Sequence, residues 1–166
     1  MFSSGILTIS DKGSRGERVD ESGKIIRDIL SQLNSKVIKY DIVPDEVDLI
    51  ANRLAEWADG GSVDVIITTG GTGLGPRDVT PEATTSVIDK TVPGLAETMR
   101  TATFSITPFA ILSRAVAGFR GKCLIINLPG SPKAVQECLQ VILPAIPHAV
   151  EIIKGEVTEH KDTGRK

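Results

Sequence analysis

The chain has few of the side chains that most often serve in acid–base catalysis or base stacking. Its 166 residues include two histidines and 4% aromatic residues. His148 and His160 lie late in the chain, and neither is expected to be catalytic. Nucleic-acid binding needs a positive field or stacking platforms, and the formal net charge of −2 supplies no such field. We therefore expect no nucleic-acid partner.

Long apolar runs and a cysteine framework are also missing. No stretch approaches the roughly 18 uninterrupted apolar residues of a membrane span. Residues 1–7 lack the basic start and long apolar region of a signal peptide. Cys123 and Cys138 have no metal-ligand spacing and fit a reducing compartment, so we expect two buried core thiols. Together these features predict a cytoplasmic protein without a membrane partner.

What is present is typical of an ordinary globular domain. The chain is 40% hydrophobic and 24% charged, and its length suits one domain with a proper core. We expect this domain to cover residues 1–154. Residues 155–166 are expected to form a charged, flexible C-terminal tail.

Apolar periodicity predicts that strands and helices alternate in the first 70 residues. Strands are expected at 6–10, 37–43 and 63–67, and residues 11–19 are expected to be a loop. Two helices open at Asp20 and Asp45. Their apolar stripes are Ile25, Ile26, Ile29, Leu30 and Leu33 in the first, and Val47, Ile50, Leu54 and Trp57 in the second. This β-α-β-α-β order predicts a mostly parallel sheet covered by helices, which is an α/β fold.

The second half adds helices and one hairpin. Helices are expected from Pro81 and over 94–103, and strands at 115–119 and 122–127 meet at the tight turn Arg120-Gly121. This hairpin would make the sheet mixed at one edge. Another helix follows Pro132, with Val135, Cys138, Leu139 and Ile142 facing inward, and a final helix follows it.

The most informative segment is the glycine-rich stretch 68–82, TTGGTGLGPRDVTPE. It follows a buried strand and runs into Thr80-Pro81, where Thr80 can cap a helix and Pro81 suits its first position. Four glycines within six positions exceed what a turn needs, and their backbone N–H groups can face an anion. The spacing fits neither known phosphate motif, since Pro76 or Asp78 stands where Rossmann needs glycine, and Pro76-Arg77 stands where Walker needs Lys-Ser or Lys-Thr.

Four loops should meet beyond the carboxyl ends of the parallel strands, where open sheets bind ligands. They are 10–12, 44–46, 70–80 and 127–132. Three of them carry an aspartate, namely Asp11, Asp45 and Asp78, which suits a metal ion bridging phosphates. Simpler roles remain open, because Asp20 and Asp45 also stand where helix caps belong and Asp11 could form a turn.

Taken together, these loops resemble the MogA/MoaB family of molybdenum-cofactor biosynthesis proteins. The likeness extends from about Ile6 to about Ile153. Besides the glycine-rich stretch it rests on the segments 8–12, 44–46, 127–132, 107–108 and 111–114, which read TISDK, PDE, NLPGSP, TP and ILSR.

The resemblance implies the fold and the activity of the family. It implies a three-layer α/β/α sandwich with a mostly parallel, mixed sheet, and a molybdopterin adenylyltransferase, a nucleotidyltransferase that transfers AMP from Mg-ATP to the terminal phosphate of molybdopterin and releases pyrophosphate. The implied cofactor is Mg²⁺, and the implied substrates are ATP and molybdopterin. The implied partners are two further copies, in a homotrimer, and a molybdenum-insertion enzyme that receives the product.

The resemblance also assigns site residues by position. Asp45 and Asp78 match the catalytic carboxylates, which act through magnesium. The substrate- and nucleotide-binding positions are Ser10, Asp11, Gly70, Gly71, Thr72, Gly73, Pro129, Gly130 and Ser131. Because an ionised phosphate is the nucleophile, no general base is needed, and Arg77 or Lys12 could stabilise the pyrophosphate.

The segment Arg77-Asp78-Val79-Thr80 favours the catalytic branch of the family. MoaB-like members, some of them inactive, tend to carry a Gly-Asp-Gln-Ala-like segment there. A non-catalytic molybdopterin-binding scaffold is the alternative, and another nucleotidyltransferase is a third hypothesis. The contacts of the charged loop 13–18 stay open.

Overall fold

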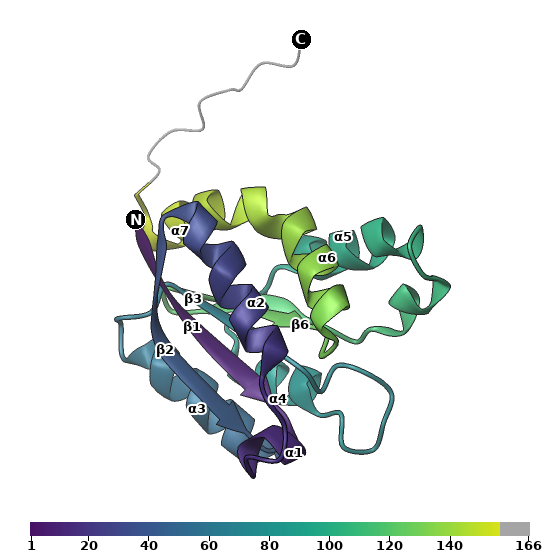
Figure 1. Cartoon of the computed structure of the whole chain (residues 1–166). Coiled ribbons are helices and arrows are strands. Elements are labelled where there is room, and N and C mark those ends of the chain that lie inside the picture. Colours follow the sequence, from purple (N-terminus) through teal and green to yellow (C-terminus); the bar gives the residue numbers. More distant parts are fainter. Residues whose placement is uncertain (157–166) are drawn as a thin grey trace.

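The computed structural model describes residues 1–156 and contains a six-stranded sheet (Figure 1). The strands lie in the order β2-β1-β3-β6-β5-β4. The strands are β1 (Phe2–Ile9), β2 (Ser35–Val43), β3 (Val65–Thr69), β4 (Lys90–Thr91), β5 (Ala117–Arg120) and β6 (Cys123–Leu128). The first four strands in this order are parallel, and β5 and β4 pair antiparallel. The sheet is therefore mixed at one edge, as predicted.

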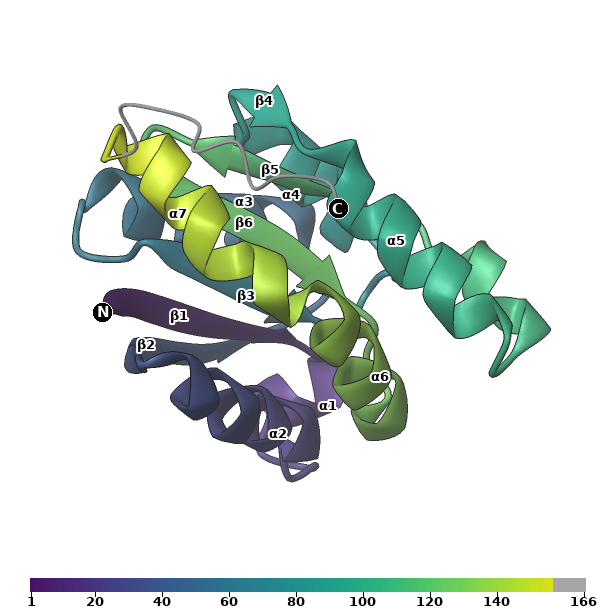
Figure 2. The same cartoon turned by 90° about the horizontal axis from the view of Figure 1, so that it is seen from above.

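Helices cover both faces of this sheet (Figure 2). The α-helices are α1 (Asp11–Ser14), α2 (Glu21–Leu30), α3 (Val47–Asp59), α4 (Thr80–Val87), α5 (Pro93–Phe104), α6 (Pro132–Ile142) and α7 (Ile146–Lys154). Three 3₁₀ turns are η1 (Ser31–Leu33), η2 (Pro108–Leu112) and η3 (Leu143–Ala145). Helices α2, α5, α6 and α7 pack on one face, while α3 and α4 pack on the other. The predicted three-layer α/β/α sandwich is confirmed.

The central strands are buried on both sides because side chains alternate between the two faces. In β6, Leu124, Ile126 and Leu128 enter the core under α2, α5, α6 and α7, while Cys123 and Ile125 enter the core under α3 and α4. Burial raises the pKa of the Cys123 thiol to about 12. Cys138 is buried in α6 and its pKa is raised for the same reason, so the prediction of two core thiols is confirmed.

Several predicted element bounds are wrong in detail. Residues 11–14 form one helical turn instead of a loop, because the Ser10 side chain accepts the Gly13 N–H at 2.9 Å and caps it. The two-residue strand β4 was missed, since both of its residues are exposed and have no apolar pattern. Val47, assigned to the apolar stripe of α3, is 37% exposed.

Two further expectations concern membrane-spanning segments and the C-terminal tail. No helix within residues 1–156 is long and apolar enough to cross a membrane. Helix α7 ends at Lys154, where Gly155 takes a left-handed φ of 76°. Residues 157–166 lie outside the described part of the chain, so the flexible tail over 155–166 stays a prediction.

Candidate functional site

Four strand-end loops meet at one edge of the sheet, as predicted. Strands β2, β1, β3 and β6 are adjacent and parallel, so all four end at this edge. Strand β2 lies on one side of β1, and the next strand in the chain, β3, lies on the other side. The carboxyl ends of β1 and β3 therefore form a topological switch point, the usual ligand position in open α/β sheets.

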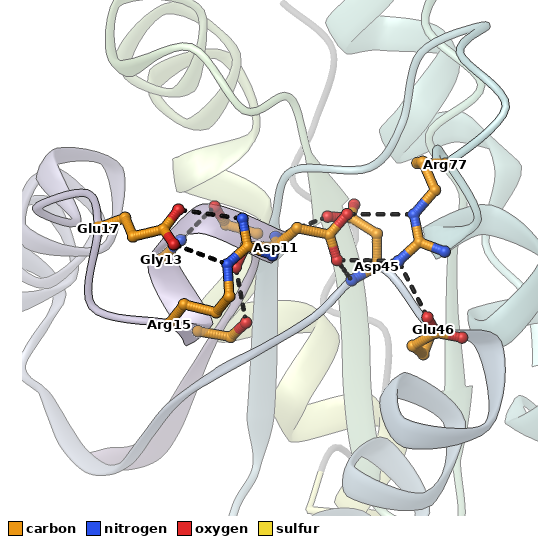
Figure 3. A network of polar contacts seen from close by, with 9 residues as sticks. Asp11, Gly13, Arg15, Glu17, Asp45, Glu46 and Arg77 are labelled. Atoms are coloured by element: carbon orange, nitrogen blue, oxygen red, sulfur yellow. Dashed lines mark hydrogen bonds and ion pairs between the residues drawn. The ribbon is translucent and has the colours of Figure 1, made fainter.

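Asp11 and Asp45 join the first two of these loops by reciprocal hydrogen bonds (Figure 3). The Asp11 N–H donates to Asp45 Oδ2 at 2.9 Å, and the Asp45 N–H donates to Asp11 Oδ1 at 3.0 Å. Asp45 is not a helix cap, because Glu46 takes the N-cap position of α3. Asp11 does not serve its own turn either, since its carboxylate bonds to a different loop. Both simpler roles are therefore wrong.

Arg77 ties the third loop to the same pair. Its Nε and Nη2 donate to the two carboxylate oxygens of Asp11 at 3.1 and 2.9 Å, and Nη2 also donates to Glu46 at 2.9 Å (Figure 3). The Arg77 guanidinium holds the pKa of the Asp11 carboxyl below its ordinary value. In this structure Arg77 is thus paired with two carboxylates, and its contact with pyrophosphate stays a prediction.

Asp45 lies in an environment that disfavours its negative charge. Burial raises the pKa of this half-buried carboxyl, and the nearby charges of Asp11 and Asp78 raise it further. The hydrogen bond from the Asp11 N–H and the charge of Arg77 act in the opposite direction. A cation placed beside Asp45 and Asp78 would relieve this repulsion, which makes the pair suitable for a metal ion.

The first two glycines of the loop allow a close turn after β3. Gly70 and Gly71 have left-handed φ angles of 97° and 68°. A Cβ on Gly70 would collide with the Ile9 carbonyl, and one on Gly71 with the Thr80 hydroxyl. The prediction that Thr80 caps α4 is wrong, because Val79 takes the N-cap position. Instead the Thr80 hydroxyl and N–H donate to the carbonyls of Gly70 and Gly71 at 2.8 and 3.0 Å.

The other two glycines make room for Asp78. The Asp78 carboxylate accepts the Gly75 N–H at 2.9 Å. A Cβ on Gly73 or Gly75 would lie 2.8 or 2.9 Å from Asp78 Oδ2, which is too close for either side chain. Each of the four glycines therefore stands where a Cβ would be too close to a neighbouring atom. For Gly73 and Gly75 that neighbour is Asp78, a predicted catalytic residue.

The loop after β6 closes against the glycine loop. The Thr69 hydroxyl donates to the Pro129 carbonyl at 2.7 Å, and the Ser22 hydroxyl of α2 donates to the Gly130 carbonyl at 2.8 Å. A Cβ on Gly130 would lie 3.3 Å from the Gly70 Cα, so the two backbones are in close contact. Ser131 caps α6 by accepting the Ala134 N–H.

Two cavities of about 610 and 590 Å³ open along these loops. Of the predicted site residues, Ser10, Asp45 and Gly70 line the first cavity, and Thr72, Gly73 and Pro129 line the second. Gly71, Asp78, Gly130 and Ser131 line both. Asp11 lines neither, because its side chain is engaged with Asp45 and Arg77 beside them. The structure thus brings together every predicted position and places Asp78 at the junction of the cavities.

The first cavity contains charged groups that the sequence did not identify as site residues. Its lining includes Arg18, Asp20 and Glu21 in addition to Asp45 and Asp78. Asp20 caps α2, which confirms the simpler role considered for it. Its carboxylate also accepts hydrogen bonds from the hydroxyls of Thr8 and Tyr40, each at 2.6 Å. The only sequence feature that could have indicated a binding role for Arg18, Asp20 and Glu21 was the polar, glycine-containing segment 11–19 that contains or precedes them.

The second cavity has a more apolar wall made by α5, η2 and α6. Met99, Phe109, Leu112 and Cys138 contribute to it. Sequence analysis placed a helix over 94–103 but assigned no site residue to it. The segment after it, with Thr107-Pro108 and several exposed apolar side chains, was the signal that could have indicated a binding wall.

Asp45 and Asp78 do not form a complete metal cage by themselves. Within residues 1–156, no group of three or more histidine, cysteine, aspartate or glutamate side chains is arranged to hold a metal ion. Magnesium is commonly held by one or two carboxylates and by oxygens of substrate phosphates, so the two aspartates fit that donor set.

The site combines a glycine-rich turn, two helix N-termini and carboxylates at a topological switch point. These features define an α/β protein that handles phosphate-bearing ligands. Residues 5–148 match the family described as "Probable molybdopterin binding domain". The chain belongs to this family, which confirms the relationship inferred from the loop motifs.

Relatives and solved structures agree with this assignment. The molybdopterin adenylyltransferase of Helicobacter pylori (strain J99) is 49% identical over 153 residues, which cover 91% of this chain and 87% of the relative. The molybdopterin adenylyltransferase of Escherichia coli (strain K12) is 34% identical over 169 residues, covering 93% and 87%. A crystal structure of the molybdopterin biosynthesis enzyme MoaB from Thermus thermophilus is 53% identical, with a TM-score of 0.89 and coverage of 93% and 98%.

Proposed function

We propose that this protein is a molybdopterin adenylyltransferase, which transfers AMP from Mg-ATP to the terminal phosphate of molybdopterin. The observation that carries this proposal is the position of Asp78 at the junction of two cavities, beside Gly71, Gly130 and Ser131. The activity is also the one printed in the names of the adenylyltransferases that are 49% and 34% identical.

Two adjoining cavities suit a reaction that joins two substrates. Each has a volume typical of a small-molecule site. An oxygen of the pterin phosphate attacks the α-phosphorus of ATP, the bond from that phosphorus to the bridging oxygen of the β-phosphate breaks, and pyrophosphate leaves with the electron pair. The attacking phosphate is already ionised near pH 7, so the chain supplies position and charge rather than a base.

The charges of the first cavity require a cation if a polyphosphate is to bind there. Four carboxylates and one guanidinium line it, which is a formal charge of −3. We propose that Asp45 and Asp78 hold Mg²⁺ together with substrate phosphates. When bound, the metal neutralises phosphate charge. The glycine loop supplies backbone N–H groups, and the N-terminus of α6 at Ser131 adds a partial positive charge.

The remaining proposed binding positions surround the same junction. Gly70 to Gly73 form the phosphate cradle, because the hydrogen bonds from Thr80 to the Gly70 and Gly71 carbonyls fix the shape of their turn. Ser10 and the Asp11–Asp45 pair shape the end of β1, and Pro129 and Gly130 form the opposite wall.

We further propose that the protein works as a cytoplasmic homotrimer and delivers its product to a molybdenum-insertion enzyme. Self-association is supported by apolar side chains that are exposed on α5 and just after it, where the chain projects beyond the sheet (Figure 2). These side chains are Phe104, Ile106, Phe109, Ile111 and Leu112. Sedimentation equilibrium tests the assembly, and a monomer at micromolar concentration would contradict it.

The activity is tested by incubating the protein with molybdopterin and Mg-ATP. Adenylylated pterin and pyrophosphate are the expected products. Binding of molybdopterin without release of pyrophosphate would instead support the alternative, a non-catalytic scaffold.

Asp78→Asn tests the residue that carries the proposal. Asparagine keeps an acceptor for the Gly75 N–H but removes the charge, so we expect AMP transfer to fall about 100-fold while the fold is retained. Asp59→Asn is a matched control, because Asp59 pairs with Arg120 and lines neither cavity. Wild-type turnover in Asp78→Asn would exclude the assignment.

A further inference from the structure

Arg114 lies beside the glycine-rich loop and is not among the residues that line either cavity. It belongs to the segment between η2 and β5. Its backbone N–H donates to the Thr72 carbonyl at 2.9 Å. Its guanidinium donates through Nε to the Gly73 carbonyl at 2.8 Å and through Nη2 to the Asp78 carbonyl at 2.6 Å, and it pairs with Glu82 of α4.

These hydrogen bonds connect the start of the loop, at Thr72 and Gly73, to its end at Asp78. Residues 70–79 contain no helix or strand, and glycines leave their backbone many conformations. A planar guanidinium presents its donors in a fixed fork, so one side chain sets the distance between Gly73 and Asp78. The Asp78 carboxylate is in turn oriented by the Gly75 N–H inside the segment that Arg114 closes.

Arg114 is itself held by the wall of the second cavity. Arg100 of α5 donates through Nη1 to the carbonyls of Ser113 and Ala115, at 3.2 and 3.0 Å. These two residues flank Arg114 in the chain, and together with Arg100 they line the second cavity. A continuous set of contacts therefore runs from that wall through Arg114 to Asp78.

We infer that Arg114 is a positioning residue, which fixes Asp78 at the junction of the two cavities without touching substrate. This inference rests on the proposed adenylyl transfer. Removing the guanidinium frees two loop carbonyls and Glu82, so the loop relaxes and the Asp78 carboxylate loses its defined place. A misplacement of about 1 Å at a reacting centre costs on the order of 100-fold in rate.

The test compares Arg114→Gln and Arg114→Lys with a matched control, Arg120→Gln. Arg120 is 31% exposed and Arg114 34%. Arg120 also joins a carboxylate, that of Asp59, to a backbone carbonyl, that of Val87, and it lines neither cavity. A merely structural role would affect the two sites alike.

We expect Arg114→Gln to lower kcat about 100-fold while the KM for ATP changes less than about threefold, because the cavity walls remain and the reacting geometry is lost. Arg114→Lys should recover only part of the rate, since an ammonium group cannot span both carbonyls. Arg120→Gln should keep kcat within about twofold. An unchanged kcat in Arg114→Gln, or an equal loss in Arg120→Gln, would overturn the inference.

Hydrogen–deuterium exchange provides a readout besides activity. Amides of residues 70–79 should exchange faster in Arg114→Gln than in the wild-type protein, and at an unchanged rate in Arg120→Gln. Unchanged exchange in Arg114→Gln would overturn the inference even if the enzyme is impaired. An inactive wild-type protein would contradict the proposed function, whereas the exchange rates would still show whether Arg114 fixes the loop.

Discussion

Asp45→Asn should separate the contribution of one carboxylate to activity from its contribution to stability. The substitution keeps nearly the same shape, and the asparagine carbonyl can still accept the Asp11 N–H, now bonded at 2.9 Å. The formal charge of the first cavity changes from −3, set by four carboxylates and one guanidinium, to −2. Loss of one key electrostatic group costs about 100-fold or more in turnover.

The stability of the same variant should move in the opposite direction. The pKa of Asp45 is raised in the folded protein, chiefly by burial, so the folded state holds its proton more strongly than the unfolded state does. The contribution of Asp45 to wild-type stability therefore falls as pH rises through the window above the ordinary carboxyl pKa of about 3.9. Asparagine has no such penalty. Because Asp45 keeps contact with solvent, we expect a gain below about 1 kcal/mol, or a Tm higher by at most about 4 °C.

Two measurements check this prediction. Pyrophosphate release at saturating substrates gives the turnover, and thermal unfolding at neutral pH and near pH 3.5 gives the stability difference. That difference should be present at neutral pH and be much smaller near pH 3.5, below the ordinary carboxyl pKa, where Asp45 is mostly protonated in both states. A clear loss of Tm combined with full turnover would refute the reasoning, because it would mean that Asp45 has only a structural role.

Two further predictions concern the loop and its support. Gly71→Ala should lower the free energy of unfolding by about 1–3 kcal/mol and impair AMP transfer, because Gly71 has a φ of 68° and its Cβ would meet Thr80. Gly16→Ala is the matched control in urea denaturation, with a φ of 72° and nothing within 4 Å, so equal losses would contradict the packing argument. Asn127→Ala should cost about 3 kcal/mol, because the fully buried amide makes three hydrogen bonds, to two threonine hydroxyls and one backbone N–H. A loss below about 1 kcal/mol would show that these bonds are replaced in the variant.

The position of the site was predictable because it follows from the order of the elements. Buried runs such as 63–67 identify parallel strands, and the carboxyl ends of parallel strands share one edge. The start of α6 also followed from local rules, since Ser131 stands before Pro132, which suits the first position of a helix. These inferences require only neighbouring residues and the handedness of βαβ connections.

Pairings between loops were not predictable in the same way. The reciprocal bonds of Asp11 and Asp45, and the partners of Arg77, depend on how far each loop extends beyond its strand. Local rules therefore allowed a cap role for Asp45, as the simpler alternative, and for Thr80, and neither residue caps its helix. No role was predicted for Arg114, because its partners are two backbone carbonyls and one carboxylate, that of Glu82, which are distant in sequence and leave no residue pattern.

The wall shared by the two cavities has a kinetic consequence. The product of the proposed reaction is a nucleotide and a pterin in one covalent molecule, and we expect it to extend across the four residues that line both cavities. Once one half is bound, the other is held at a high effective concentration beside its own cavity, so the joined molecule should dissociate far more slowly than either half. We therefore expect the joined product to inhibit the enzyme at lower concentrations than either of its halves does.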